Sequence, residues 1–192
     1  GWSTNTPRAS ILNQVPQWSY DGSSTGQAET GDSDLFINPV RVYTATEGDE
    51  ILVLCSVTTF DGAPVKSEKR YQLADLAKTY ESNKWLFGIE QEYVLMDDTG
   101  TRLYRWPDAA FPGEQGPYYC GVGYDEAYGA DIVDEHTDTC IGYGIAICGT
   151  NAEVMPSQWE FQIGAKDPLT VADDLITARY LLYRVAAHYA AT

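Results

Sequence analysis

The sequence predicts an α+β fold, in which strands are grouped in hairpins and helices form separate segments. Two β-rich runs, residues 35–43 and 51–59, are separated only by a turn-like segment at residues 47–49. Apolar residues at helical spacing predict long helices over residues 128–140 and 168–190. Because strands and helices do not alternate strictly, the pattern favours α+β over a parallel α/β sheet.

Composition supports a packed chain with one domain, or one domain and a small second one. The chain has 192 residues, of which 44% are hydrophobic and 21% charged. That hydrophobic share is enough to build a core, and disorder is not expected. The weakest boundary lies near residues 79–84, so we predict an arm, a small N-terminal unit and a larger second unit, over residues 1–19, 20–82 and 83–192.

The N-terminal unit should begin with irregular chain. Pro7 and Pro16 predict an extended arm over residues 1–19, followed by a loop rich in Gly, Ser and Thr. Apolar residues at helical spacing predict a helix over residues 67–82, with Ser67 as its N-cap.

The second unit should contain several strands and two helices. The helix at residues 128–140 is expected to bury His136 and Cys140, and Pro168 suits the first turn of the last helix. The segment from 104 to 123 is rich in aromatic residues and proline, which predicts loop with a short strand. The other strands are predicted at residues 85–96, 145–148, 153–155 and 159–163.

The charge of the chain limits its partners. The formal net charge is −16 and the sequence pI is near 4.2, so nucleic acids and anionic membranes would be repelled. The sequence contains no run of about 18 apolar residues, so it predicts no membrane-spanning helix. The chain starts at Gly1 without an initiator Met or a signal-peptide pattern, so we expect it to be processed, excised or partly represented.

The four cysteines, Cys55, Cys120, Cys140 and Cys148, show no C-x-x-C spacing. This pattern gives no support to a zinc or thioredoxin-like site. Buried free thiols are the expected state, which favours a reducing compartment such as the cytoplasm, a chloroplast or a mitochondrion.

A first pair of carboxylates, Glu90 and Glu92, lies within the predicted strand at residues 85–96. Alternate side chains of a strand share one face, so these two should point the same way, with Ile89 and Tyr93 on the apolar face. An ordinary solvated strand face is the competing interpretation.

A second pair, Glu153 and Glu160, flanks Pro156 and Ser157. A bend centred between Pro156 and Ser157 would place the two glutamates opposite each other across a hairpin. Two such clusters predict a site for a hard cation such as Mg²⁺ or Mn²⁺. The alternative is that the two strands never meet.

Five segments of the chain resemble glutamine synthetase of the eukaryotic type, in the right order and over nearly the whole chain from residue 16. They are residues 20–28 (YDGSSTGQA), 87–93 (FGIEQEY), 116–121 (GPYYCG), 151–164 (NAEVMPSQWEFQIG) and 178–182 (ARYLL). The resemblance implies a partial β-grasp-like N-terminal unit followed by the first half of a catalytic α/β domain. It also implies rings of subunits with active sites between neighbours.

The resemblance implies the ATP-dependent joining of ammonia to glutamate through γ-glutamyl phosphate. By position, Glu92, Glu153 and Glu160 match the ligands of one metal, and Glu90 matches a ligand of a second metal that bridges the ATP phosphates. In the same way, Asp21 matches a loop aspartate that assists ammonium in a neighbouring subunit's site. Ser24 matches its companion.

The chain ends at Thr192, before the family's later metal-binding histidine and glutamate and its substrate-binding arginines. His136 and His188 lie outside such motifs and are expected in the core or on the surface. We therefore expect a truncated, non-catalytic relative that serves as a structural or accessory subunit in a hetero-complex, with a residual Mg²⁺ or Mn²⁺ site. The alternative is part of an active, homo-oligomeric glutamine synthetase, with ATP bound only if the missing half is present.

Overall fold

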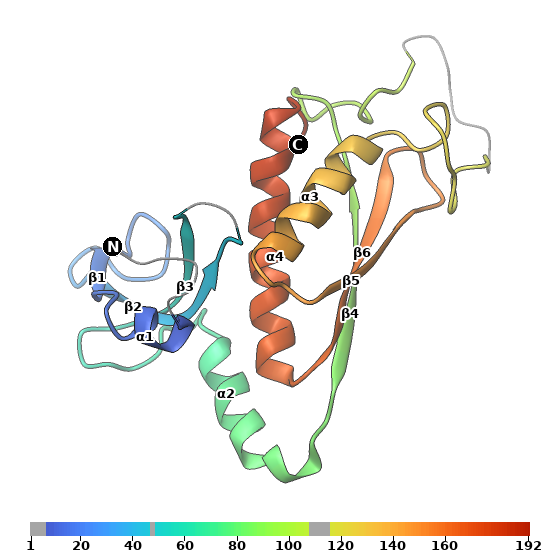
Figure 1. Ribbon diagram of the computed structural model, residues 1–192. Coiled ribbons are helices and arrows are strands. Elements are labelled where there is room, and N and C mark those ends of the chain that lie inside the picture. The colour runs from blue at the N-terminus through green and yellow to red at the C-terminus, as the bar shows by residue number, and fades with distance from the viewer. Residues whose placement is uncertain (1–6, 47–48, 108–115) are drawn as a thin grey trace. The chain divides into compact units, whose positions relative to one another are not determined.

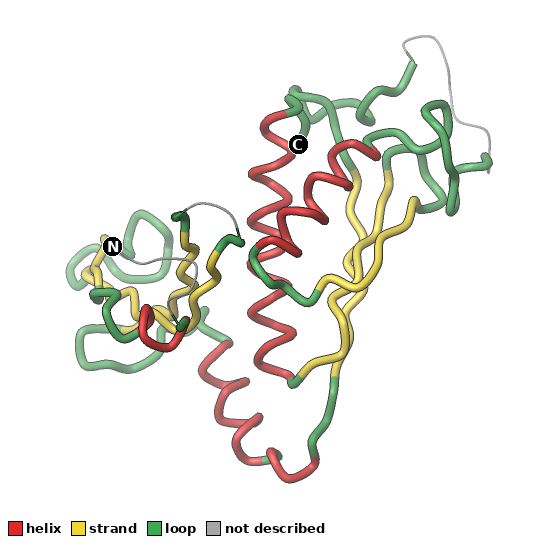
Figure 2. Tube along the Cα trace, viewed as in Figure 1, coloured by secondary structure: helices red, strands yellow, loops and turns green. Residues whose placement is uncertain are grey.

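The computed structural model describes residues 7–46, 49–107 and 116–192 (Figures 1 and 2). Two separate three-stranded sheets and separate helices confirm the α+β class. By contacts the chain forms two compact units, residues 1–85 with 167–173 and residues 86–166 with 174–192. No helix in the described part is long and apolar enough to span a bilayer.

The first unit is built on an antiparallel sheet in the order β1-β2-β3, from β1 (Trp18–Asp21), β2 (Asp34–Thr44) and β3 (Ile51–Thr58). The β2–β3 register shifts between Pro39 and Arg41. A proline has no N–H to give to the ladder, so it is found at edges and bulges, and this explains the irregularity.

The helices of the first unit correct two predictions. Residues 8–12 form the short helix α1 (Arg8–Leu12) instead of extended chain, and its Ile11 is fully buried. Helix α2 (Arg70–Thr79) begins after Lys69, so Ser67 is not its N-cap. The Glu68 carboxylate accepts a bond from the Arg70 N–H at 2.9 Å, so a later acidic side chain satisfies the helix start. A 3₁₀ turn, η1 (Glu81–Asn83), follows α2.

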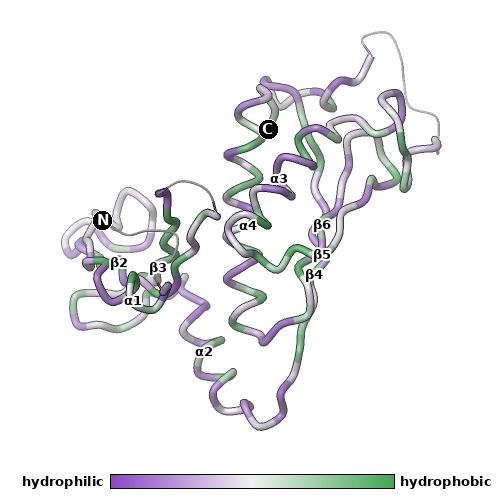
Figure 3. The backbone as a smooth tube through the Cα atoms, in the orientation of Figure 1, coloured by the Kyte–Doolittle hydropathy of each residue, from purple (hydrophilic) through white to green (hydrophobic). Residues whose placement is uncertain are grey.

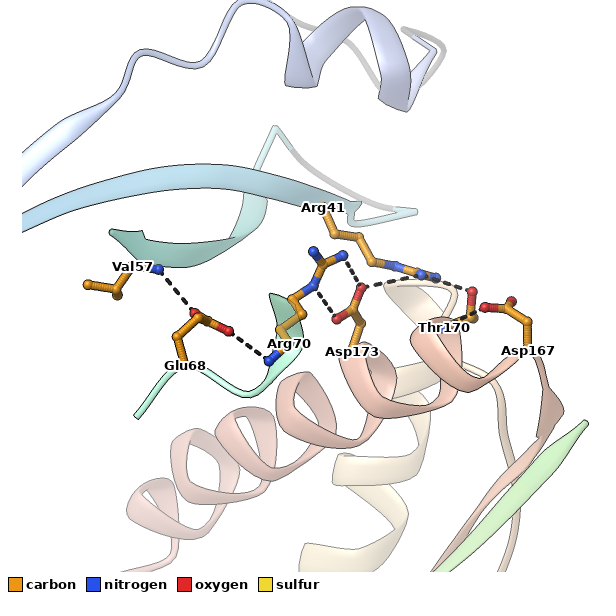
Figure 4. A network of polar contacts seen from close by, with 7 residues as sticks. All are labelled: Arg41, Val57, Glu68, Arg70, Asp167, Thr170 and Asp173. Carbon is orange, nitrogen blue, oxygen red and sulfur yellow. Dashed lines mark hydrogen bonds and ion pairs between the residues drawn. The ribbon is translucent and has the colours of Figure 1, made fainter. Parts of the chain in front are cut away.

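A polar network joins the elements of the first unit (Figure 4). Asp173 is 2% exposed and accepts two bonds from Arg70, at 2.8 and 2.9 Å. Arg41 approaches the same carboxylate at 3.8 Å. Glu68 binds the Val57 N–H of β3 at 3.0 Å as well as the start of α2. The network therefore connects β2, β3, α2 and the first two turns of the last helix.

The second unit has an antiparallel sheet in the order β4-β6-β5, from β4 (Phe87–Val94), β5 (Ile147–Ala152) and β6 (Gln158–Lys166). The strand predicted at residues 153–155 is wrong, because the chain bends there. The described residues between 104 and 123 contain no strand, although Leu103 forms an isolated bridge with Met96.

Two helices cover one face of this sheet, α3 (Ala130–Gly142) and the part of α4 (Pro168–His188) that belongs to the second unit. Hydrophobic and hydrophilic stretches follow one another along both helices, as expected of helices with one buried side (Figure 3). His136 of α3 is fully buried, and its ring centroid lies 5.1 Å from that of Phe161 of β6. The prediction that His136 is a core residue is confirmed.

All four cysteines are free, but only one of them is fully buried. Cys140 lies in the core, where burial raises the pKa of its thiol to about 12. Cys55 is partly buried, whereas Cys120 and Cys148 are exposed. The expectation of buried thiols is therefore wrong for Cys120 and Cys148, whose glycine-rich surroundings lie at the surface.

Candidate metal centre

The central strand β6 brings the predicted carboxylates onto one sheet. Glu160 lies directly opposite Glu92 of β4 and, on its other side, opposite Asn151 of β5. Glu90 lies opposite Gln162, so it occupies the same face as Glu92. The strands do meet, and three of the four predicted ligands share a face that points away from α3 and α4.

The hairpin register around Glu153 differs from the prediction. Glu160 pairs with Asn151 instead of Glu153, and the Glu153 N–H donates to the Gln158 carbonyl at 2.8 Å. Pro156 and Ser157 are the central residues of a tight turn, with φ of +59° at Ser157. A turn with proline first and a positive φ second suits type II, whose twist is unfavourable in a two-residue hairpin. The loop therefore widens to residues 154–157, and Glu153 moves past the end of β5.

Three of the carboxylates are each bound by an amide side chain. Gln158 donates to Glu92 at 2.9 Å, and Asn151 donates to Glu153 at 3.3 Å. Gln162 donates both to Glu160, at 2.5 Å, and to the Asn151 oxygen, at 2.8 Å. A continuous set of amide bonds therefore links Glu160 with Glu153.

The electrostatic position of Glu160 is unusual. This carboxylate is 8% exposed, and no basic side chain among the described residues forms an ion pair with it. Its cross-strand neighbour Glu92 carries a like charge and is exposed. A buried carboxylate beside a second one costs free energy unless hydrogen bonds or a cation compensate for it.

The chemical type of the available ligand atoms, oxygen, suits a hard divalent cation. Mg²⁺ and Mn²⁺ prefer carboxylate and carbonyl oxygens, and the acidic and amide side chains paired on this face offer such oxygens. In the described part, however, no three His, Cys, Asp or Glu side chains lie close enough together to hold an ion. The predicted ligands Glu90, Glu92, Glu153 and Glu160 thus share a region of the sheet without converging on one point.

The other predicted site residues, Asp21 and Ser24, belong to the first unit. Asp21 ends β1, and its carboxylate accepts bonds from the Ser23 hydroxyl at 2.6 Å and from the Ser24 hydroxyl at 3.4 Å. The Ser23 hydroxyl and N–H are the main groups that lower the pKa of Asp21. This exposed carboxylate is therefore ionised at neutral pH and held by its own loop.

Some residues near the face were not predicted as site residues. Asn151, Gln158 and Gln162 occupy it, and the alternation of side chains along β6 could have identified the two glutamines once Glu160 was chosen. Cys120 and, next to it in effect, Glu153 raise the pKa of the exposed Tyr119 phenol, which indicates that this ring lies near Glu153. No spacing in the sequence identifies Tyr119.

Comparison with known proteins supports one family. The family described as "Glutamine synthetase, catalytic domain" matches residues 67–192. The chain is 46% identical to glutamine synthetase 2 cytoplasmic of Drosophila melanogaster over 178 residues, covering 92% of this chain and 48% of the relative. It is 48% identical to the glutamine synthetase of Streptomyces viridochromogenes, covering 93% of this chain and 52% of the relative. The chain thus spans about half the length of these curated relatives.

Solved structures show the same fold at low identity. The glutamine synthetase of Plasmodium falciparum superposes with a TM-score of 0.72 at 17% identity, covering 100% of this chain and 43% of the other. A structure described as a GmaS/ADP complex gives a TM-score of 0.73 at 16% identity, covering 95% of this chain and 43% of that one.

Proposed function

The chain belongs to the glutamine synthetase family, and from that premise we propose that its second unit supplies the carboxylate side of a divalent-cation site for ATP-dependent joining of ammonia to glutamate. The observation that carries the proposal is the pairing of Glu92 with Glu160, a like-charged pair with one buried member. A bound Mg²⁺ or Mn²⁺ would remove the repulsion within this pair.

The proposal gives each residue a role. Glu92, Glu153 and Glu160 hold one cation, and Glu90 contributes to a second. When bound, the cations offset the negative charge of the transferred phosphoryl group. Asp21, ionised and supported by Ser23 and Ser24, would attract ammonium in a neighbouring copy of the chain. Homo-oligomeric partners belong to this proposal.

Calorimetry with Mn²⁺ tests the cation site. We expect the chain to bind Mn²⁺, and the Glu160→Gln variant, which keeps the shape and removes the buried charge, to lose binding. Asp138, an exposed carboxylate of α3, provides the matched control, because Asp138→Asn removes one negative charge away from the face. If the chain releases no heat with Mn²⁺, or if both variants bind as the parent does, the proposal is wrong.

A second candidate function is a non-catalytic, structural or accessory subunit of a hetero-complex. It is favoured by one observation: three of the four predicted ligands are bound by amide side chains, and the described residues form no group of three metal-binding side chains. Under this proposal ATP would not bind to the chain alone. We expect the isolated 192-residue polypeptide, about half the length of its relatives, to form no glutamine from glutamate, ATP and ammonia. Measurable glutamine would exclude this candidate.

A further inference from the structure

Two amide side chains on the sheet face that carries Glu92 and Glu160 form a connected series of hydrogen bonds, which begins at Gln162. The Gln162 amide nitrogen donates to Glu160 and to the Asn151 oxygen, and the Asn151 nitrogen then donates to Glu153. A primary amide has two N–H donors, and Gln162 uses both here. Glu160 and Glu153, which do not face each other across the hairpin, are therefore joined through two neutral side chains.

The strand register makes this arrangement possible. Gln162 follows Glu160 by two residues on β6, so both point to the same face, and Asn151 lies opposite Glu160 on β5. The wide hairpin loop leaves Glu153 one residue past the end of β5, where its N–H still donates to the Gln158 carbonyl. One oxygen of the Glu153 carboxylate accepts a bond from the Val154 N–H at 3.2 Å, and Asn151 donates to the other oxygen at 3.3 Å, so the two contacts together restrict its rotamers.

Neutral donors suit this position better than cations would. An arginine or lysine beside Glu160 would form an ion pair and compete with a metal for the carboxylate. An amide bonds one oxygen of the carboxylate, leaves lone pairs free, and offsets part of the repulsion from Glu92. Partners of this kind orient metal ligands in proteins, and their loss costs about 10–100-fold in metal affinity.

We propose that Gln162 and Asn151 act together as positioning residues, which orient Glu160 and Glu153 for the same divalent cation. This inference rests on the proposed cation site. It assigns these two amides a role in metal affinity that goes beyond the stability of the sheet.

Mn²⁺ affinity of the full 192-residue chain, measured by calorimetry, tests the proposal. Gln162→Met keeps an unbranched side chain of similar length and removes both donors. Gln91→Met makes the same change on β4, one residue from Glu92, but Gln91 pairs with Phe161 and so lies on the opposite face. We expect Gln162→Met to weaken Mn²⁺ binding by about 10–100-fold and Gln91→Met to leave it within about twofold.

A double variant tests whether the two amides act as a unit. If they do, Asn151→Ala and Gln162→Met together weaken Mn²⁺ binding no more than about as much as the stronger single change. Thermal unfolding of each variant, followed by circular dichroism, ensures that affinities are compared at the same folded fraction. A purely structural role would lower the melting temperature and leave the affinity of the folded protein unchanged.

The outcomes separate the two proposals. If the parent chain binds Mn²⁺ and Glu160→Gln abolishes binding while Gln162→Met binds like the parent, the positioning role is wrong and the cation site stands. If the parent chain itself does not bind Mn²⁺, both proposals fail. Independent, additive losses from Asn151→Ala and Gln162→Met would overturn their joint action.

Discussion

At the scale of single residues, His136 shows how burial fixes a protonation state. Its Nε2 lies 2.9 Å from the Ala178 carbonyl, which can only accept a bond, so Nε2 carries the proton. The Cys140 sulfur lies 3.2 Å from the same nitrogen, and Nδ1 is buried without a partner among the described residues. Burial lowers the pKa of His136, although the bond to Ala178 works against this. The folded protein therefore holds a neutral imidazole in its core.

The pKa of His136 predicts how stability depends on pH. The unfolded chain takes up a proton near pH 6.5, and the folded chain only at lower pH. The contribution of neutral His136 to the free energy of unfolding is therefore fully present above about pH 6.5. It falls as the pH decreases toward the folded pKa, with a slope of up to about 1.4 kcal/mol per pH unit. In urea unfolding between pH 5 and 7, His136→Leu should flatten this slope, although it lowers stability at every pH.

The exposed His188 provides the control for this measurement. His188→Gln should retain the slope, because this change leaves the buried His136 and its surroundings in place. An unchanged slope in His136→Leu would show that another group causes the dependence.

At the scale of elements, the start of α3 depends on a glycine. Gly129 precedes the helix with φ of +87°, and a Cβ there would lie 2.5 Å from the Leu95 side chain, which is 2% exposed. Gly100 also has a positive φ, +65°, but the nearest atom to its added Cβ is 3.8 Å away. Comparing alanine substitutions at the two positions therefore separates the cost of backbone strain from the cost of side-chain crowding.

We expect Gly100→Ala to cost about 1 kcal/mol of unfolding free energy, from left-handed strain alone. Gly129→Ala should cost about 1–3 kcal/mol more, because Leu95 must move in a packed core. Urea unfolding of the two variants checks the difference. Equal losses would mean that the core around Leu95 accommodates a methyl group.

Elements also show what the sequence could and could not predict. Alternation along β4 predicted that Glu90 and Glu92 share a face, because a strand has a period of two. The pairing of Glu153 with Glu160 was wrong because register depends on the turn, and the wider loop at residues 154–157 is set by the type II geometry. The amide contacts of Asn151 depend on that register, so they could not be predicted before it was known.

At the scale of the whole molecule, one helix contributes to both compact units. Residues 167–173 belong to the first unit, and the rest of α4 belongs to the second. Asp173 binds Arg70, whereas Asp174 accepts a bond from the Ala146 N–H at 3.1 Å. Consecutive residues of a helix point about 100° apart, so two neighbouring acids can serve different surroundings. Both are almost fully buried, at 2% and 1% exposure.

The matched pair Asp173→Asn and Asp174→Asn tests this division of α4. Asp173→Asn leaves Arg70 without its anionic partner, and breaking such a buried pair costs about 3–5 kcal/mol. We expect faster amide hydrogen exchange, followed by mass spectrometry, in β2, β3 and α2. Asp174→Asn should instead accelerate exchange around Ala146 and the start of β5. If either change loosens both units equally, the two units unfold together and α4 does not separate them energetically.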